Sequence, residues 1–513
     1  MRFLLYNFPL FIGMFCLSCQ TDTPPKSKTE PLADTPNFVF ILADDLGWAD
    51  LGCYGSSFYE TPNLDQMAAE GMRFTQAYAA CPVCSPTRAS IMTGKYPARI
   101  HLTDWIPGRQ SYLPEEPQNR LKAVPFEQQV RLEETTLAEA LKAGGYTTYF
   151  AGKWHLGTDS IYWPEHQGFD TNVGGHSKGS PPGGYFSPYD NPRMESGPEG
   201  EYLTDRLTQE SVNFLDTIAE RPFLLYLSFY TVHNPMQAKD SLVKKYEAKA
   251  QEMGIVESDR FTYESPWIKK APQRGNFRDR LVQDSPVYAA MIETMDDNIG
   301  KLLAKLKEMG LEENTVVFFT SDNGGLSTSE GSNTTNAPLR AGKGWLYEGG
   351  IREPLIVKWP KEVAKGYVCS EPVTSTDFFP TMLDLSGLDL LPSQHVDGKS
   401  FRPLFEVSKS GPDWERGPLY WHYPHHSNQG GKPGGVIREG EWKLIEFYEE
   451  QTVELYNLSQ DVGETNNLAK TQPEKAEELQ KKLRQWLEEV DADEMQANPT
   501  YNASYMRVPP ANK

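Results

Sequence analysis

The stretch NFVFILADD (Asn37–Asp45) decides the fold, because an apolar run ends abruptly in two acidic residues. The same arrangement of an apolar run followed by polar residues recurs in YTTYFA (146–151), PFLLYLSFY (222–230) and NTVVFFT (314–320). Continuous runs of β-branched and aromatic residues are typical of strands that are buried on both faces of a sheet. We therefore predict four buried strands with polar residues at their ends.

Helical patterns separate these strands. TLAEALKAGG (136–145) opens with a capping box formed by Thr136 and Glu139. SPVYAAMIETMDDNIGKLLAKLKEMG (285–310) begins with a proline and repeats apolar residues at helical spacing. This alternation predicts an α/β fold with a mainly parallel sheet. Because ligands of such sheets bind beyond the carboxyl ends of the strands, the four polar ends should converge on one site.

The pattern changes after about residue 405. Short strand-like runs with Gly-rich turns lead to a closing amphipathic helix, EKAEELQKKLRQWLEEV (474–490). We predict a catalytic domain over 37–405 and a smaller α+β subdomain over 406–513, with a small antiparallel sheet and a helix. The Gly- and Pro-rich segment 181–200 is predicted to be a long loop that forms a wall of the site.

The N-terminus carries a targeting pattern. Residues 1–19 have one early arginine and a short apolar run, which is typical of a signal peptide and too interrupted for a membrane span. Cys19 follows a loose lipoprotein cleavage pattern, and residues 20–36 form a polar, Pro-rich tether. We expect export by a bacterium to the periplasm or as an outer-membrane lipoprotein, with a lipid at Cys19 as the only membrane contact. Ordinary signal cleavage is the alternative.

The formal net charge of −20 over 513 residues argues against a nucleic-acid partner. An anionic substrate would then need a few convergent lysines and arginines. Apart from the N-terminal segment, the chain has four cysteines, Cys53, Cys81, Cys84 and Cys369, which are too few for a disulfide framework in a chain of this length.

The acidic strand ends are candidates for a metal site. Asp44, Asp45, Asp322 and Asn323 together would offer three carboxylates and an amide oxygen. Such hard oxygen ligands suit Ca²⁺ or Mg²⁺. The alternative is that each pair only caps the turn after its strand, although two such pairs at one sheet edge weaken that interpretation.

Basic residues accompany the acids. The candidates are Arg88, Lys153, His155, His233 and Lys343. Positive side chains beside a divalent cation fit a tetrahedral oxyanion, either phosphate or sulfate. A single histidine after a strand is more often a structural residue than a catalyst, so the weight of this prediction rests on the whole group.

Cys84 lies in ACPVCSPTRASIMTG (80–94). Pro86 in the first turn would place Cys84 at a helix N-terminus, which attracts negative charge. A zinc site would need a second Cys/His pair at similar spacing, and Cys53 and Cys369 supply none. A thioredoxin-like pair would need a small domain without nearby acids. A buried, inert thiol is the usual fate of a free cysteine, but it would leave the surrounding residues unexplained.

At this point the sequence resembles a known family. CSPTRASIMTG (84–94) is similar in full to the signature of the formylglycine-dependent type I sulfatases, which belong to the alkaline phosphatase superfamily. Further similar blocks occur in family order at 36–55, 61–78, 147–157, 319–325, 337–354 and 454–469. The resemblance implies a sulfuric ester hydrolase. It also implies an alkaline phosphatase-like fold, with a large mixed, mainly parallel sheet between helices.

The resemblance further implies that a maturation enzyme oxidises Cys84 to Cα-formylglycine. One hydroxyl of the hydrated aldehyde would attack sulfur, and deprotonation of the second would release sulfate. Residue 84 would join the four acidic and amide residues as ligands of Ca²⁺, with Mg²⁺ a less suitable ion. The implied roles of the basic residues are as follows: Arg88 steadies the formylglycine, His155 bonds its hydroxyl, Lys153 and Lys343 bind sulfate, and His233 protonates the leaving alcohol.

Two further segments suggest a substrate. KYPARIHLTDWIPG (95–108) and HHSNQGGKPGG (425–435) resemble parts of bacterial sulfatases that act on galactose or N-acetylgalactosamine 4-sulfates. The candidate sugar contacts are His101, Asp104, Trp105, His425 and His426, with loop packing as the alternative for each. Two other functions stay open: a phosphonate monoester or phosphodiester hydrolase of the same superfamily, and a non-catalytic protein that binds sulfated glycans.

Overall fold

The computed structural model of the protein describes residues 35–108, 117–218, 221–255, 260–263, 265, 277–406 and 414–504. The predicted signal peptide, Cys19 and nearly all of the predicted tether lie outside the described residues. Within the described ranges, none of the helices has the length and apolar character that a membrane span requires.

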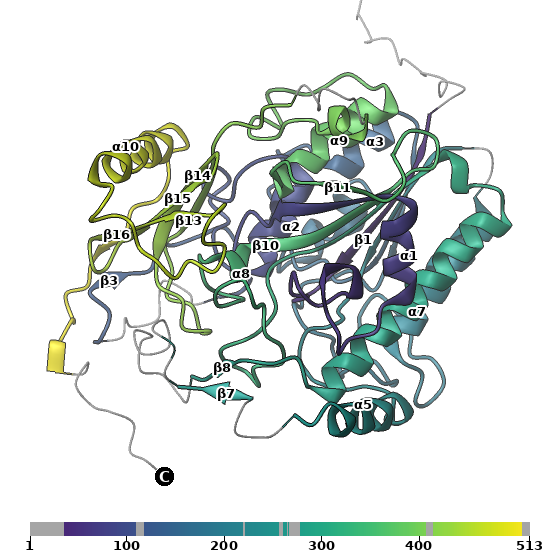
Figure 1. The fold of residues 1–513 in the computed structure, drawn as a ribbon. Coiled ribbons are helices and arrows are strands. Elements are labelled where there is room, and N and C mark those ends of the chain that lie inside the picture. Colours follow the sequence, from purple (N-terminus) through teal and green to yellow (C-terminus); the bar gives the residue numbers. More distant parts are fainter. Residues whose placement is uncertain are drawn as a thin grey trace, which may run out of the picture.

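A nine-stranded sheet forms the centre of the molecule (Figure 1). Its strands are β1 (Asn37–Ala43), β2 (Met72–Tyr78), β4 (Thr147–Gly152), β5 (Thr171–Val173), β6 (Phe223–Ser228), β9 (Thr315–Ser321), β10 (Arg352–Lys358), β11 (Tyr367–Cys369) and β12 (Val373–Thr374). The order is β11-β2-β10-β9-β1-β6-β4-β5, and β12 pairs with β2. β1 pairs in parallel with β6 and β9, and β4 extends the parallel set, whereas β10 is antiparallel to both of its neighbours.

The four predicted strands are therefore confirmed as β1, β4, β6 and β9, and each of them is buried along nearly its whole length. β6 ends at Ser228, earlier than predicted. Phe229 follows the last residue of β6, and its backbone amide donates to the Leu42 carbonyl of β1 at 2.9 Å. A mixed, mainly parallel sheet with all four strand ends at one edge is the result.

Helices cover both faces of this sheet. Val39, Ile41 and Ala43 on one face of β1 belong to the core beneath α1 (Pro62–Glu70), α4 (Leu203–Thr217), α5 (Asp240–Glu252) and α7 (Pro286–Glu308). Phe38, Phe40 and Leu42 face α2 (Cys84–Thr93), α3 (Leu137–Ala143) and α9 (Phe378–Ser386). Side chains alternate along a strand, so β1 supplies both cores. The predicted capping box at the start of α3 is present.

A second, antiparallel sheet follows in the chain. It consists of β13 (Leu419–Tyr423), β14 (Gly434–Glu439), β15 (Trp442–Phe447) and β16 (Thr452–Asn457). One face packs against α10 (Pro473–Glu489), and the other shares a core with residues near the start of α2 and around 341–351. The smaller α+β part is thus confirmed, whereas the boundary between 405 and 406 stays a prediction.

A buried ion cluster joins the two sheets. Lys443 on β15 lies 3.0 Å from Glu348 at the start of α8 (Glu348–Ile351) and 2.8 Å from Glu464, and all three side chains are fully buried. Arg352 at the start of β10 adds a contact to Glu348 at 3.2 Å. This cluster fixes the chain on either side of α8, which leads into the central sheet.

The remaining elements are short. β3 (Leu121–Lys122) pairs with β17 (Gln496–Ala497), and β7 (Phe261–Thr262) pairs with β8 (Asp279–Arg280). Single 3-10 turns lie at Gly52–Tyr54, Ser160–Tyr162, Pro164–His166, Glu312–Asn314, Ser375–Asp377 and Arg402–Phe405. The segment 181–200 has neither helix nor strand, apart from an isolated bridge between Phe186 and Tyr202.

Candidate active site

The predicted polar residues meet at the carboxyl ends of the parallel strands. Asp44 follows β1, Lys153 follows β4 and Asp322 follows β9, while His233 lies a few residues beyond β6. Because these four strands are adjacent and parallel, their ends open at the same edge of the sheet. Helix α2 begins at Cys84, as predicted, and brings that residue to the same edge.

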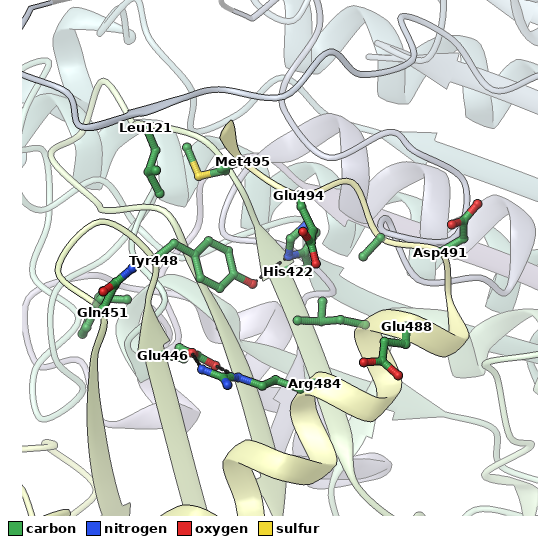
Figure 2. Close-up of a pocket in the computed structure, with 13 residues that line it drawn as sticks. Leu121, His422, Glu446, Tyr448, Gln451, Arg484, Glu488, Asp491, Glu494 and Met495 are labelled. Carbon is green, nitrogen blue, oxygen red and sulfur yellow. Dashed lines mark hydrogen bonds and ion pairs between the residues drawn. The ribbon is translucent and has the colours of Figure 1, made fainter. Parts of the chain in front are cut away.

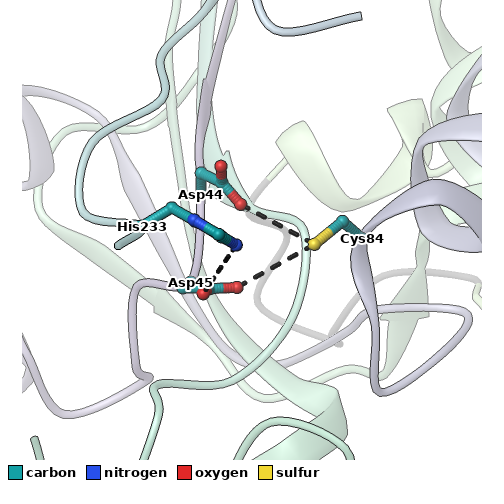
Figure 3. Close-up of side chains that lie close together, drawn as sticks. All are labelled: Asp44, Asp45, Cys84 and His233. Atoms are coloured by element: carbon teal, nitrogen blue, oxygen red, sulfur yellow. Dashed lines mark hydrogen bonds and ion pairs between the residues drawn. The ribbon is translucent and has the colours of Figure 1, made fainter. Parts of the chain in front are cut away.

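Cys84 lies against the two acids that end β1 (Figure 3). Its Sγ is 3.8 Å from Oδ1 of Asp44 and 4.0 Å from Oδ1 of Asp45. On the other side of Asp45, Nε2 of His233 lies 3.7 Å from Oδ2. Each of these four residues offers a ligand atom, and those atoms all lie within 4.8 Å of one another.

Three cationic side chains neutralise the acids. Nζ of Lys153 is 2.8 Å from each oxygen of Asp44. Nζ of Lys343 is 2.7 Å from Oδ2 of Asp45. Nε and Nη2 of Arg88 both lie 2.7 Å from Oδ2 of Asp322. All six residues are buried, so these charges interact far more strongly than they would in water.

Arg88 forms hydrogen bonds with groups at the ends of three strands. Besides Asp322 after β9, it donates through Nη1 to the Lys153 carbonyl at 2.9 Å and to Oγ of Ser228 at 2.6 Å. It lies one helical turn after Cys84 on α2. Arg88 therefore fixes the position of α2, and of residue 84 at its start, relative to the acidic strand ends.

Asn323 completes a set of oxygen donors. Its Nδ2 donates to Oδ1 of Asp45 at 2.8 Å and to the Gly324 carbonyl at 3.1 Å. Its buried Oδ1 has no hydrogen-bond partner among the described residues. A buried acceptor without a partner is costly, and a bound cation would satisfy it. With the three carboxylates, this donor set fits a hard divalent cation.

The pKa values of the two acids that follow β1 are shifted in opposite directions. Burial raises the pKa of Asp44 to about 8, although Lys153 counteracts this effect. Burial also opposes ionisation of Asp45, but Lys343 and His233 outweigh it and hold the pKa of Asp45 below its ordinary value. Because a cation would displace the proton that Asp44 favours, metal binding at this cluster should strengthen with rising pH.

His155 is held as a neutral base. Its Nε2 contacts the carbonyl of Ile106 and must donate to it, and its buried Nδ1 has no hydrogen-bond partner among the described residues. Burial and the neighbouring Lys153 lower the pKa of His155 well below its ordinary value. Its backbone adopts the left-handed region with φ 61°, and Gly179 lies so close that a Cβ there would meet the imidazole ring at 2.3 Å.

His233 is the member of the group most open to solvent, with 17% of its side chain exposed. Its Nδ1 lies 2.7 Å from the carbonyl of Asn234 and donates to it, so Nε2 faces the site. Burial and Lys343 lower the pKa of His233 to about 3. The hydroxyl of Tyr185, from the predicted loop wall, donates to the carbonyls of Tyr230 and His233 at 2.5 and 2.9 Å.

The environment of Cys84 does not favour a thiolate. Burial raises its pKa to about 12, although Lys153 and Lys343 counteract this effect. Cys84, Cys81, Cys53 and Cys369 form no disulfide within the described ranges. Cys81 contacts the Thr103 carbonyl through Sγ at 3.9 Å and, among the described residues, belongs to no cluster of metal-binding side chains. The zinc and dithiol alternatives for this cysteine pair thus find no support in the geometry.

Family comparison agrees with the geometry. The sulfatase family model matches residues 36–388, and that of the N-sulphoglucosamine sulphohydrolase C-terminal region matches 341–493. The chain belongs to the sulfatase family. The resemblance deduced from the sequence is thereby confirmed, and with it the assignment as a sulfuric ester hydrolase.

Named relatives of this sulfatase include a "Sulfatase" of Formosa agariphila, 30% identical over 94% of this chain and 92% of the relative. The N-acetylgalactosamine-6-sulfatase of Mus musculus is 34% identical over 72% of this chain and 66% of its own length. The solved structure of Ps i-CgsB in complex with k-i-k-neocarrahexaose is 30% identical, has a TM-score of 0.69 and covers 91% of this chain and 94% of its own.

The alkaline phosphatase-like architecture extends beyond sulfatases. The phosphonate monoester hydrolase of Agrobacterium radiobacter has a TM-score of 0.59 over 89% of this chain and 95% of its own, at 21% identity. At that identity the likeness concerns the fold alone. The expected fold, a mainly parallel sheet between helices, is therefore confirmed.

The five predicted sugar contacts do not gather at one point of the sulfatase. Asp104 and His425 are buried together, with Nδ1 of His425 3.9 Å from Oδ2 of Asp104. Asp104 also accepts from the Tyr423 hydroxyl at 3.1 Å, and burial raises its pKa to about 7. Their satisfied contacts fit the packing alternative better than direct sugar binding.

Trp105 lies beside a residue that contacts His155. It is half-buried, and its neighbour Ile106 donates through its backbone amide to Oγ of Ser85 at 3.0 Å and contacts His155 through its carbonyl. His101 and His426 point elsewhere. His101 pairs with Asp493 at 2.8 Å, and Nε2 of His426 lies 3.2 Å from the Leu121 carbonyl.

A cavity of about 950 Å³ lies between the second sheet and the end of α10 (Figure 2). It is lined by Leu121, His422, Glu446, Phe447, Tyr448, Gln451, Arg484, Leu487, Glu488, Asp491, Ala492, Glu494 and Met495. No residue of the acidic and basic cluster lines it. His426 contacts Leu121, which lines the cavity, and His101 contacts Asp493, which lies between the lining residues Ala492 and Glu494 in the chain.

A further polar group, Glu330, contacts the residue after His233 and is not among the residues predicted from the sequence. Glu330 accepts through Oε1 from Nε2 of Gln429 at 2.8 Å and from Nδ2 of Asn428, and its carbonyl accepts from Nδ2 of Asn234 at 3.0 Å. Asn428 and Gln429 lie within the 425–435 segment that the sequence singled out. Glu330 lies in an ordinary polar loop and carries no sequence signal of its own.

Proposed function

We propose that this sulfatase hydrolyses an O-sulfate ester of a sugar in a sulfated glycan. The ester and one water yield the free sugar hydroxyl, sulfate and a proton. The observation that carries this proposal is the position of Cys84, whose Sγ lies within 4.0 Å of two acids that are paired with Lys153 and Lys343. A nucleophile, a cation site and two anion-binding lysines thus meet at one point.

We propose that residue 84 is converted to formylglycine by a maturation enzyme. A formylglycine at this position supplies, as the hydrated aldehyde, two hydroxyls, one for attack on sulfur and one for releasing the sulfate. The raised pKa of the Cys84 thiol supports this assignment, because an unmodified, protonated thiol is a weak nucleophile.

The oxygen donors support a calcium site. Asp44, Asp45, Asp322 and Asn323, with residue 84, would hold the ion, which supplies positive charge for orienting the sulfate. In the metal-free cluster three carboxylates face the three cations Arg88, Lys153 and Lys343. A divalent ion would leave the cluster with surplus positive charge, which suits an anionic ester.

The basic side chains have separate tasks in this scheme. Lys153 and Lys343 bind sulfate oxygens, and Arg88 holds Asp322 and α2 in place. His155 accepts a proton at Nδ1, which has no partner among the residues that the structure describes. His233 presents Nε2 to the ester oxygen and protonates the leaving alcohol. The nearby anionic sulfate favours the charged imidazolium and so raises the pKa of His233 from its low value in the free enzyme.

The proposed substrate is a galactose or N-acetylgalactosamine sulfate. The sequence favours the 4-O-sulfate, and the N-acetylgalactosamine-6-sulfatase of Mus musculus, 34% identical to this chain, makes the 6-O-sulfate the second position to test. Trp105 is the predicted sugar contact whose neighbour touches His155. Export, with a lipid at Cys19, remains part of the proposal and would bring the enzyme to extracellular glycans.

A desulfation screen tests the function. Sugars sulfated at defined positions should release sulfate, and galactose and N-acetylgalactosamine sulfates should be the best of them. Phosphonate monoesters and phosphodiesters belong in the same screen. Faster turnover of these phosphorus esters would contradict the proposal and favour the other hydrolase of the superfamily.

Cys84→Ala should lower kcat by at least about a thousandfold, because the nucleophile is lost. Binding of a sulfated sugar, followed by calorimetry, should persist, and Cys53→Ala is the control for a free cysteine outside the cluster. Peptide mass analysis of the active enzyme should show residue 84 converted to the aldehyde. Full activity of a preparation whose Cys84 is an intact thiol would refute the mechanism.

Removal of metal provides an independent test. Dialysis against a chelator should abolish turnover, and Ca²⁺ should restore it, because the proposed donors are all hard oxygen ligands. Sulfate release measured before chelation, after chelation and after re-addition gives the result. Unchanged activity after the bound metal has been shown to be gone would exclude the metal assignment.

A further inference from the structure

We propose that Glu330 makes the enzyme select sugars that carry no second negative charge beside the scissile sulfate. This inference rests on the proposed function, because it concerns the sugar whose sulfate is removed. The carboxylate would accept a hydrogen bond from a neutral neighbouring hydroxyl and repel a neighbouring sulfate.

Glu330 lies on the solvent-exposed side of the catalytic cluster. Its carbonyl accepts from Nδ2 of Asn234, the residue directly after His233. His233 is the most exposed side chain of the cluster and presents Nε2 to the leaving oxygen in the proposed mechanism. A sugar joined to that oxygen must therefore extend past His233, into the neighbourhood of Asn234 and Glu330.

The side chain of Glu330 is held in place. Its Oε1 accepts from Nε2 of Gln429 at 2.8 Å and from Nδ2 of Asn428. The Gln429 carbonyl in turn accepts from Oγ1 of Thr328 at 2.8 Å and from Nε1 of Trp345 at 3.0 Å. A carboxylate fixed in this way can discriminate between ligands without first paying the entropic cost of ordering.

The loop 425–431, which contains Asn428 and Gln429, packs on the backbone beside Lys343. A Cβ placed on Gly344 would lie 2.2 Å from Oγ of Ser427 and 2.8 Å from Oε1 of Gln429, so the two segments are in direct contact. Lys343 and Asp45 are close enough to Glu330 for both charges to affect its pKa, which burial of the carboxyl raises. The carboxyl group is thus packed among neighbours, although the residue as a whole is exposed.

Chemistry explains the selection. A carboxylate only accepts hydrogen bonds, so it can bind a hydroxyl but can offer nothing to a sulfate, which also only accepts. Glu330 contacts Asn234, which directly follows His233, and His233 presents Nε2 to the ester oxygen in the proposed mechanism. We therefore expect the substituent next to the scissile ester to be the part of the sugar nearest Glu330. A second sulfate there would bring two negative charges together.

The test compares two sugars that differ only in a second sulfate on the carbon next to the scissile one. The wild-type enzyme should prefer the monosulfated sugar. In Glu330→Gln the ratio of the two kcat/KM values should fall by roughly tenfold or more, because the charge repulsion is lost. The measurement is made at pH 8, because burial raises the pKa of Glu330 and a higher pH favours its ionised form. Gln retains an oxygen that accepts from Gln429, so the loop should stay in place.

Glu313→Gln is the matched control, because Glu313 is exposed and precedes β9 at the opposite edge of the sheet. It removes the same charge and should leave the ratio unchanged. An unchanged ratio in Glu330→Gln, with both sugars turned over, would overturn the inference and leave the proposed function intact. A wild-type enzyme that desulfates neither these sugars nor any other in the screen would instead overturn the proposed function.

Discussion

Burial sets the reactivity of single side chains in this site. It favours the protonated Cys84 thiol and the neutral imidazole of His155, whose Nδ1 has no hydrogen-bond partner in the part of the chain that the structure describes. The same effect lowers the pKa of His233, whose Nε2 lies 3.7 Å from Asp45. Each of these states suits a particular task, because a buried group responds strongly to the charge of a bound anion.

At the scale of one residue, His233→Ala should separate proton transfer from the other steps. The variant should lower kcat for a sugar sulfate by about 10²–10⁴-fold, because the leaving alkoxide needs a proton. It should have a much smaller effect on nitrophenyl sulfate, whose leaving phenolate is stable without one. The ratio of kcat values for the two substrates is the measurement.

His166→Ala serves as the control, because His166 is an exposed histidine in a short 3-10 turn away from the cluster. It should change neither rate. If His233→Ala slowed both substrates by the same factor, His233 would contribute to binding or positioning and not to protonation of the leaving group.

At the scale of elements, α8 and β15 are joined through buried charge. Lys443→Met should destabilise the protein by about 3–5 kcal/mol at pH 8, because Glu348 and Glu464 would remain buried without their shared cation. Urea unfolding measures the change. Lys432→Met, which removes a partly exposed ion pair with Glu450 next to the same sheet, should cost less than about 1 kcal/mol.

The effect of this variant should depend on pH. Burial raises the pKa of Glu464 to about 7, with Lys443 counteracting the shift, so protonation of Glu464 stabilises the folded state. Stability from a raised pKa is present at low pH and is lost as pH rises through the folded pKa. The cost of Lys443→Met should therefore shrink as pH falls from 8 toward 5. A pH-independent cost would show that packing, and not charge, is lost.

The elements and their polar ends could be predicted because both follow from local chemistry. Apolar runs of strand length mark β1, β4, β6 and β9, and the rule for parallel sheets brings their ends together. The positions of the predicted sugar contacts could not be derived in the same way. His101 and Asp104 are neighbours in the chain, but His101 has φ 53° and reaches Asp493, whereas Asp104 reaches His425.

The position of Glu330 could not be predicted from the sequence either. Its partners Asn234 and Gln429 come from loops on either side of it in the chain, and no periodicity links the three. Contacts of this kind depend on tertiary packing, here on the packing of the loop 425–431 against Gly344. A single sequence contains no signal for a contact of this kind.

At the scale of the whole molecule, the net charge of −20 opposes the approach of an anionic glycan. Salt screens such repulsion, since the Debye length falls from about 30 Å at 0.01 M to about 8 Å at 0.15 M. We expect kcat/KM for a polysulfated glycan to rise over this range, and that for a monosulfated monosaccharide to change much less. A fall for the polymer would mean that the local lysines dominate its approach.

The loop 425–431 belongs to the second sheet, yet through Asn428 and Gln429 it supports the carboxylate beside His233, whose own position is set by the central sheet. In this proposal, cleavage of the ester depends on the central sheet, and the choice of sugar depends on a loop of the second sheet. Replacing residues 425–431 with the corresponding loop of a sulfatase that has a different substrate specificity should therefore change which polysaccharide is desulfated. The reaction centre should keep its original architecture.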